Sequence, residues 1–220
     1  MTVTRRILES DEQDLKDDLI EMYRRASLAL DKALQSLQEH DTDTAAQVIS
    51  EDKLINQLQH NIENHCIRTI ALQQPVASDL RKLMSDIFIS MELERIADHA
   101  AEIAGIALKF EAAPVAGYIQ PISEMGDKCK TMLQAVMQAY AEADETLARK
   151  AAVMDDEIDS AEQELGDFML REISGEAEQK VQCTYLLWIA HNLERIGDRA
   201  TNIAERVAYI TTSETLELNN

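Results

Sequence analysis

Apolar residues recur along most of the chain at the spacing of an amphipathic helix. Leu15, Leu19, Met22, Ala26 and Ala33, for example, follow one another at intervals of three, four or seven residues, which places them on one helix face. The pattern is interrupted at only a few short segments, so it predicts an all-α protein. We expect helices over residues 9–39, 43–73, 76–111, 119–142, 145–174 and 177–212.

Residues at the predicted helix boundaries support these limits. Asp41 and Asp144 stand just before two of the helices, where an aspartate side chain can accept hydrogen bonds from the first-turn amides. Pro75 is placed to occupy the first turn of the third helix. The chain has only 6 Gly and 3 Pro in 220 residues, and this scarcity of helix breakers favours helix throughout.

The chain contains an internal repeat. "LERIADHAAEIA" (93–104) and "LERIGDRATNIA" (193–204) lie 100 residues apart, and 8 of the 13 positions from 92–104 and 192–204 are identical. Further upstream the offset is 103, which aligns Asp41 with Asp144 and Asp52 with Asp155. Each half therefore holds three predicted helices, and three helices joined by short turns form an up-down-up bundle. We predict two tandem, pseudo-symmetric three-helix bundles, residues 1–112 and 113–220.

The repeated phrase places two acids at the edge of each predicted core. On a helical wheel its apolar residues form one stripe, and Glu94 and Asp98 lie beside that stripe, one turn apart. Glu194 and Asp198 repeat this arrangement in the second half. Arg95 should point further outward.

Each acidic pair should face a second polar pair across a groove between the second and third helices of its half. Counting back from the turn near residue 76, Glu94 is level with Asp52 and Asn56. In the second half the facing residues are Asp155 and Asp159. The eight candidate metal ligands are Asp52, Asn56, Glu94 and Asp98 in the first half, and Asp155, Asp159, Glu194 and Asp198 in the second.

Clustered carboxylates repel one another unless a cation neutralises them, and facing helices of a bundle are where carboxylate-metal sites are built. Oxygen ligands favour Mg, Mn, Ca or Fe, and carboxylates also bind Zn. The alternative is that the acids only form surface salt bridges with arginines such as Arg95. The duplication of both pairs favours metal over salt bridges.

The net charge is -20, which argues against binding to nucleic acid or to anionic lipid. No apolar run reaches the roughly 18 residues needed to span a bilayer, so we expect no direct membrane insertion. The N-terminus becomes acidic too early for a signal peptide, which favours a cytoplasmic location. The cysteines Cys66, Cys129 and Cys183 lack metal-ligand spacing and read as buried thiols.

Other residues with chemical potential carry weaker signals. Histidines 60, 65, 99 and 191 could be ligands, but scattered histidines on helices are more often surface or packed residues, and His99 should point outward. Phe88 and Trp188 occupy equivalent positions and are expected in the core. No phosphate-binding loop or nucleophile motif is present, so we expect no catalytic residues.

At the repeated phrases the chain resembles the PhoU family of phosphate-transport regulators. "PVASDLR" (75–81) and "EDKLIN" (51–56) add to the likeness, which extends over nearly the whole length. The resemblance implies two three-helix bundles with ExxxD metal motifs, binding Fe, Zn, Mn or Mg. Here Ala97 replaces the usual Gly, which should matter little, and Asn56 replaces a carboxylate.

The resemblance also implies a function and partners. A PhoU-like protein would dampen phosphate uptake through the phosphate ABC transporter and relay phosphate sufficiency to a membrane sensor kinase. It would be a cytoplasmic homodimer, held peripherally at the inner face of the membrane by its protein partners. The alternative from a different class is a carboxylate-bridged multinuclear metalloenzyme, an oxidase or phosphohydrolase, which would need an enclosed site and a general base.

Overall fold

The computed structural model describes residues 3–114, 116–172, 177–215 and 217–218, and this part of the chain contains helices and no strand. The predicted all-α fold is confirmed. The helices, in chain order, are α1 (Val3–Glu39), α2 (Thr42–Gln73), α3 (Ser78–Ala107), α4 (Ala116–Glu142), α5 (Glu145–Ala152), α6 (Asp155–Glu172) and α7 (Ala177–Thr212). None of the described helices is long and apolar enough to cross a membrane.

The two predicted N-caps are confirmed. The Asp41 carboxylate accepts hydrogen bonds from the amides of Asp43 and Thr44 at 3.0 and 3.1 Å, and Asp144 accepts from the amide of Leu147 at 3.0 Å. These bonds satisfy first-turn amides that have no partner within the helix. The third helix begins at Ser78 rather than at residue 76, so Pro75 lies in the connection before it.

The predicted helix over 145–174 is wrong in one respect, because it is two helices (its last two residues lie outside the described part). Met154 donates its amide to the Ala151 carbonyl at 3.0 Å, forming a tight turn between α5 and α6. The helix then restarts with Asp155, Asp156 and Glu157 in its first turn. Three acids there are stabilised by the positive end of the helix dipole, a local preference that outweighs the continuous apolar periodicity.

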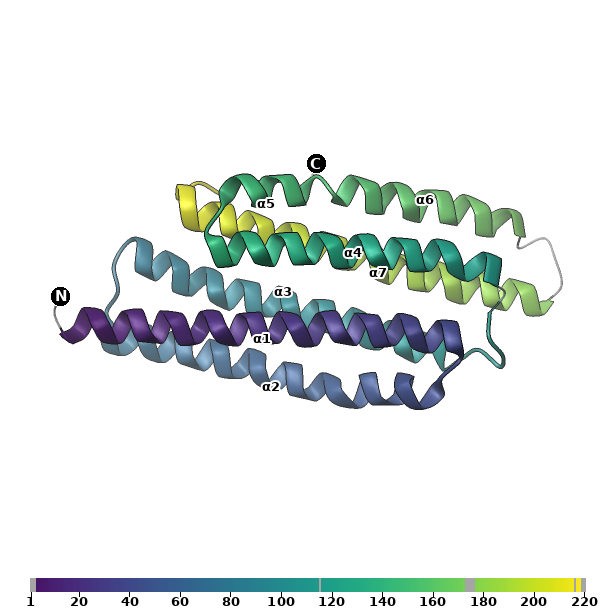
Figure 1. The fold of residues 1–220 in the computed structure, drawn as a ribbon, viewed down its shortest axis with the longest axis horizontal. Coiled ribbons are helices and arrows are strands. Elements are labelled where there is room, and N and C mark those ends of the chain that lie inside the picture. The colour runs from purple at the N-terminus through teal and green to yellow at the C-terminus, as the bar shows by residue number, and fades with distance from the viewer. Residues whose placement is uncertain (1–2, 115, 173–176, 216, 219–220) are drawn as a thin grey trace.

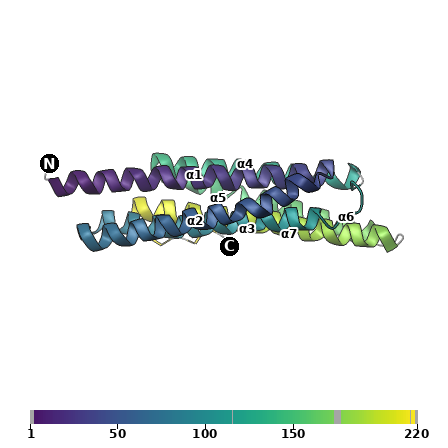
Figure 2. The same ribbon diagram turned by 90° about the horizontal axis from the view of Figure 1, so that it is seen from below.

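Two groups of helices pack side by side. Helices α1, α2 and α3 pack together in one group, and α4, α5, α6 and α7 pack together in the other. Each half therefore forms a bundle, and the counterpart of α2 in the second half is divided into α5 and α6. The groups join where α3 packs on α7 and α1 on α4. Figures 1 and 2 show an elongated molecule in which α1 and α4 form one layer over α2, α3 and α7. The boundary between residues 112 and 113 stays a prediction.

The contact between α3 and α7 repeats across the pseudo-symmetry. His99 Nδ1 lies 2.8 Å from Asn192 Oδ1. The positions 100 residues away make the matching contact, since Arg199 Nη1 lies 3.5 Å from Glu92 Oε2. His99 was expected to point outward, and it lies instead against the other bundle.

The core is formed by the predicted apolar stripes. Leu15, Leu19 and Met22 are fully buried, and all three cysteines are buried. The expectation for Phe88 and Trp188 is wrong, because their exposed fractions are 39% and 50%. Both rings lie at the surface beneath cations: the Arg206 guanidinium lies 4.3 Å from the centroid of Phe88, and the Lys109 ammonium lies over Trp188.

Candidate metal centres

Two grooves hold the eight predicted ligands, one between α2 and α3 and the other between α6 and α7. In the second groove, Asp155 and Asp159 are one turn apart on α6, and Glu194 and Asp198 are one turn apart on α7. The two helices are consecutive and pack against each other.

Asp155 is the most deeply buried of the eight, with a side chain only 3% exposed. Its Oδ2 accepts a hydrogen bond from Thr201 Oγ1 at 2.9 Å, whereas its Oδ1 is buried without a hydrogen-bond partner among the described residues. Burial raises the pKa of Asp155 to about 6, and the charges of Asp159 and Asp198 act in the same direction. Binding of a cation or a proton would therefore stabilise this carboxylate.

Asp155 can lie so close to α7 because residue 197 is glycine. A Cβ at Gly197 would stand 2.5 Å from Asp155 Oδ1 and 3.2 Å from the Ile158 side chain. The first half has Ala97 at the equivalent position, and Ala101 in place of Thr201. The difference between Gly197 and Ala97, which we expected to matter little, therefore distinguishes the two grooves.

The other three acids of the second groove are electrostatically coupled. Burial raises the pKa of Glu194, and repulsion from Asp198 and Glu162 adds to the rise. Asp159 is an exposed residue, but partial desolvation of its carboxyl group raises its pKa, and repulsion from Asp198 and Glu162 acts in the same direction. The structure thus brings the four predicted ligands of this groove together and adds Glu162.

Two further residues lie at the far end of this groove: His191, which the sequence offered only as one of several possible histidine ligands, and Glu162, which it did not single out. Glu162 lies seven residues beyond Asp155 on α6, and His191 lies seven residues before Asp198 on α7. His191 Nδ1 is 3.4 Å from Glu162 Oε1 and 3.6 Å from Glu194 Oε2. The helical spacing of both residues was visible in the sequence. The repeat does not duplicate this pair, because the equivalents in the first half are Gln59 and Met91.

The first groove also assembles its predicted residues. Asn56 Nδ2 donates to Asp52 Oδ2 at 3.0 Å, while the remaining side-chain oxygens of Asp52 and Asn56 are buried and have no partner among the described residues. Burial and then the charge of Asp98 raise the pKa of Asp52. Burial and then Asp98 also raise the pKa of Glu94, and Arg95 opposes that rise.

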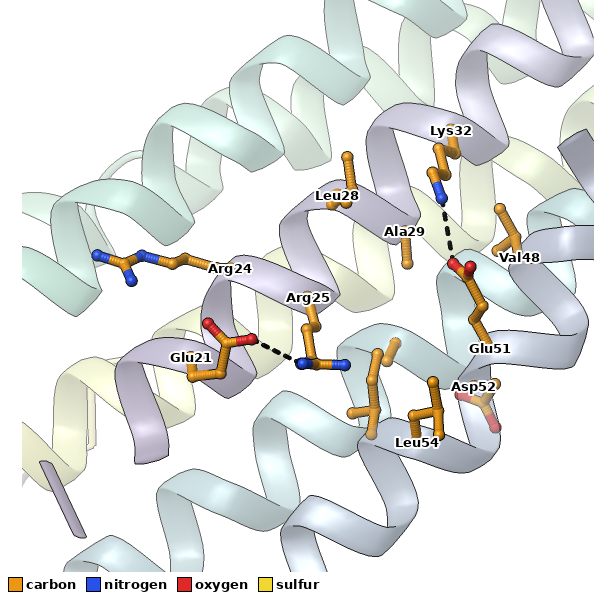
Figure 3. Close-up of a pocket in the computed structure, with 12 residues that line it drawn as sticks. Glu21, Arg24, Arg25, Leu28, Ala29, Lys32, Val48, Glu51, Asp52 and Leu54 are labelled. Carbon is orange, nitrogen blue, oxygen red and sulfur yellow. Dashed lines mark hydrogen bonds and ion pairs between the residues drawn. The ribbon is translucent and has the colours of Figure 1, made fainter. Parts of the chain in front are cut away.

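A hollow of about 350 Å³ opens beside the first groove, between α1 and α2 (Figure 3). Asp52 and Ala97 are among its lining residues. Two ion pairs cross or flank it: Arg25 with Glu21 at 2.8 Å, and Lys32 with Glu51 at 3.1 Å. Because Asp52 lines this hollow, the hollow adjoins the polar residues of the first groove.

Arginines do contact some of the acids, as the salt-bridge interpretation requires. Arg95 Nε lies 3.7 Å from Glu94, and Arg195 lies 3.5 Å from Glu194 and 2.9 Å from Asp198. Both arginine side chains are substantially exposed, at 62% and 42%, and exposed ion pairs contribute about 0 to 1 kcal/mol each. The contacts do not reach the buried oxygen of Asp155, so they leave the most costly carboxylate uncompensated.

The residues present fit a multivalent cation. Each groove combines acids whose pKa values are raised with buried oxygens that have no donor within the described part of the chain, and a bound cation would relieve both. Asp155, Asp159, Glu194 and Asp198 would hold it in the second half. Asp52, Asn56, Glu94 and Asp98 would do so in the first.

Comparisons with known proteins agree over the whole chain. The model of the PhoU domain matches twice, at residues 19–107 and 122–207. The phosphate-specific transport system accessory protein PhoU homolog of Clostridium acetobutylicum is 34% identical over 219 residues, covering 99% of this chain and 100% of its own. The homolog of Caulobacter vibrioides is 36% identical, covering 83% of this chain and 80% of its own.

Solved structures give the same result. The phosphate transport system regulatory protein PhoU from Streptococcus pneumoniae superposes with a TM-score of 0.89 at 29% identity, covering 96% of this chain and 99% of its own. PhoU from Pseudomonas aeruginosa gives a TM-score of 0.88 at 29% identity, covering 94% of this chain and 99% of its own. With two domain matches and full-length relatives above 30% identity, the chain belongs to the PhoU family.

Proposed function

We propose that this protein is a metal-binding regulatory adaptor that restrains phosphate uptake and phosphate-starvation signalling. The observation that carries the proposal is the similarity over the full length to accessory and regulatory proteins of phosphate transport. Its partners would be the cytoplasmic faces of a phosphate ABC transporter and of a membrane sensor kinase. A cytoplasmic homodimer held at the membrane by these partners accords with the acidic surface, which would not bind anionic lipid directly.

Regulation is favoured over catalysis. The relatives named above are accessory or regulatory proteins by name, which supports an adaptor rather than the oxidase or phosphohydrolase that the sequence left open. We expect the metal to act structurally, by fixing the packing of α2 on α3 and of α6 on α7.

The regulatory role is tested by deleting the gene in its own organism, in a strain without a second copy, and growing the cells with ample phosphate. Uptake of labelled phosphate and expression of a starvation-gene reporter should both rise, and the full chain should restore repression. Repression that persists in the deletion strain would contradict the proposal.

The metal role is tested separately by neutralising the repeated acids of one half. Glu194→Gln with Asp198→Asn should abolish the metal-induced rise in Tm that the second half provides, and Glu94→Gln with Asp98→Asn is the matched variant in the first half. An ion present at 100 times its Kd stabilises the fold by about 2.7 kcal/mol. In chelator the variants should equal or exceed the parent in stability, because repulsion is removed.

The salt-bridge interpretation makes the opposite forecast for the same samples. If arginine pairing is the role of these acids, neutralisation should lower Tm equally with Mn²⁺ or Fe²⁺ and with chelator. Melting parent and variants under both conditions decides between the two.

A further inference from the structure

The ligand-bearing stripes of the second groove are one turn longer than those of the first. On α6 the acids stand at 155, 159 and 162, and on α7 the facing residues stand at 191, 194 and 198. The two helices run antiparallel, since Asp155 contacts Thr201 while Glu162 contacts His191 further back along α7. Each turn of one helix therefore meets a turn of the other that offers a ligand atom.

The last of these turns holds a compact group of three. Glu162, His191 and Glu194 each present one ligand atom, and these atoms all lie within 4.8 Å of one another. Among the described residues, this is the group of three histidine, cysteine or acidic side chains whose ligand atoms come this close to one another. One small ion could contact all three ligand atoms if each atom moved by a few tenths of an ångström to about an ångström.

Two buried oxygens in the same groove point independently to a cation. Glu194 Oε2, an oxygen of the carboxylate in this group, is buried and has no hydrogen-bond partner among the described residues. The same holds at the other end of the groove for Oδ1 of the deeply buried Asp155. His191 and Arg195 approach Glu194 Oε2 only at 3.6 and 3.5 Å, too far for a hydrogen bond. An ion at the end of the groove would satisfy the Glu194 oxygen directly.

The first half has no counterpart to this group. Gln59 and Met91 stand where the second half has Glu162 and His191. An amide and a thioether cannot replace a carboxylate and an imidazole for a hard or borderline ion. Any site that needs Glu162 and His191 therefore belongs to the second half alone.

We propose that Glu162, His191 and Glu194 form an additional metal site, with two carboxylates and one imidazole, that takes Zn²⁺ or a similar borderline divalent ion. The proposal rests on the metal-binding role proposed above, and it adds a nitrogen ligand that the repeated acids do not supply. Imidazole suits Zn and Fe, whereas Mg²⁺ is bound through oxygen. The two halves thus differ in the ions they retain.

The test follows the histidine rings directly, using untagged protein stripped of metal at a pH near 7.5. Long-range ¹H–¹⁵N spectra report each of the 5 histidines separately. Titration with Zn²⁺ should shift the Nδ1 resonance of His191 to the metal-bound range. Mg²⁺ should leave it in place, and His40, whose Nε2 lies 2.8 Å from the Phe110 carbonyl oxygen, is the internal control.

Matched variants fix the ligand set. His191→Gln and Glu162→Gln should each weaken Zn²⁺ binding by at least about tenfold, since even groups that only support a ligand are worth that much. His65→Gln, on α2, should leave the affinity unchanged. A gain-of-function pair, Gln59→Glu with Met91→His, should give the first half a second imidazole-bound Zn²⁺, with circular dichroism confirming that the variant is folded.

The outcomes separate this inference from the role on which it rests. If Zn²⁺ or Mn²⁺ stabilises the parent but the His191 ring does not respond and His191→Gln binds equally well, the nitrogen site is overturned and the acidic sites stand. If neither ion raises Tm nor binds measurably to the parent, both proposals are overturned.

Discussion

Tyr140 Oη donates a hydrogen bond to Asp86 Oδ1 at 2.7 Å, joining α4 of the second bundle to α3 of the first. Asp86 is fully buried, and its other oxygen has no partner among the described residues. Burial raises the pKa of Asp86 to about 6, opposed by Tyr140 and Lys82, while Glu12 adds to the rise. A buried acid thus lies at the contact between the halves.

This acid should make the stability of the protein depend on pH. Because its pKa is raised from 3.8 to about 6, the folded state binds a proton that the unfolded state has already lost. The free energy of unfolding should therefore fall between about pH 4 and pH 6, by about 3 kcal/mol for a shift of this size. Asp86→Asn should remove this part of the decline and leave the part that Asp155 contributes over the same range. Urea titrations of parent and variant at pH 4.5 and pH 7.5 measure it, and an unchanged slope would refute the assignment.

Tyr140→Phe should weaken the same contact from the other side. The variant leaves the Asp86 carboxylate without its donor, at a cost of about 1.5 to 3 kcal/mol while the acid is ionised. The loss should be smaller near pH 4.5, where the protonated acid forms a weaker neutral hydrogen bond. Combining Tyr140→Phe with Asp86→Asn in a double-mutant cycle isolates the pair, and additive losses would show that it contributes nothing.

Gly197→Ala should damage the second groove selectively. The added Cβ would meet Asp155 Oδ1 at 2.5 Å, and overpacking of this kind typically costs about 1 to 3 kcal/mol. Metal affinity should fall in the second half and stay unchanged in the first. The control is Ala97→Gly, which should lose about 1 kcal/mol from helix propensity alone. Equal behaviour of the two variants in calorimetry and metal titration would argue against a special role for Gly197.

Thr201→Val should expose how much Asp155 depends on its one hydrogen bond. Valine preserves shape but removes the hydroxyl that donates to Asp155 Oδ2, and an unpaired buried acceptor costs about 1 to 3 kcal/mol. The loss should be seen by chemical denaturation in chelator. It should shrink when metal is added, because the ion would supply the missing positive charge. A loss that is the same in both conditions would place the ion away from Asp155.

The sequence allowed the helices and the acidic pairs to be predicted because both follow from periodicity and duplication. It did not show the break between α5 and α6, since the apolar spacing runs on through Val153 and Met154. It misplaced Phe88 and Trp188, because periodicity cannot tell a core position from a surface one covered by a cation. The contact of Asp86 with Tyr140 gave no local signal, because it joins two residues that are 54 positions apart and lie in different bundles.

The internal repeat does not point to every residue of the second groove. Gln59 and Met91 stand in the first half where the second has Glu162 and His191. Duplication therefore does not single out Glu162, and it leaves His191 as one of several scattered histidines. The repeat does point to the seven acids and one amide that occupy equivalent positions in the two halves. The structure brings each group of four together in one groove.

The contact between α3 and α7 has a genetic consequence. In a symmetric assembly of two identical chains, every codon change appears at both copies of a site. Here His99 faces Asn192 while the matching position Arg199 faces Glu92, so each member of the duplicated contact has its own codon. One copy can therefore accumulate changes while the other keeps the ancestral role, and the contact between them can adapt one side at a time.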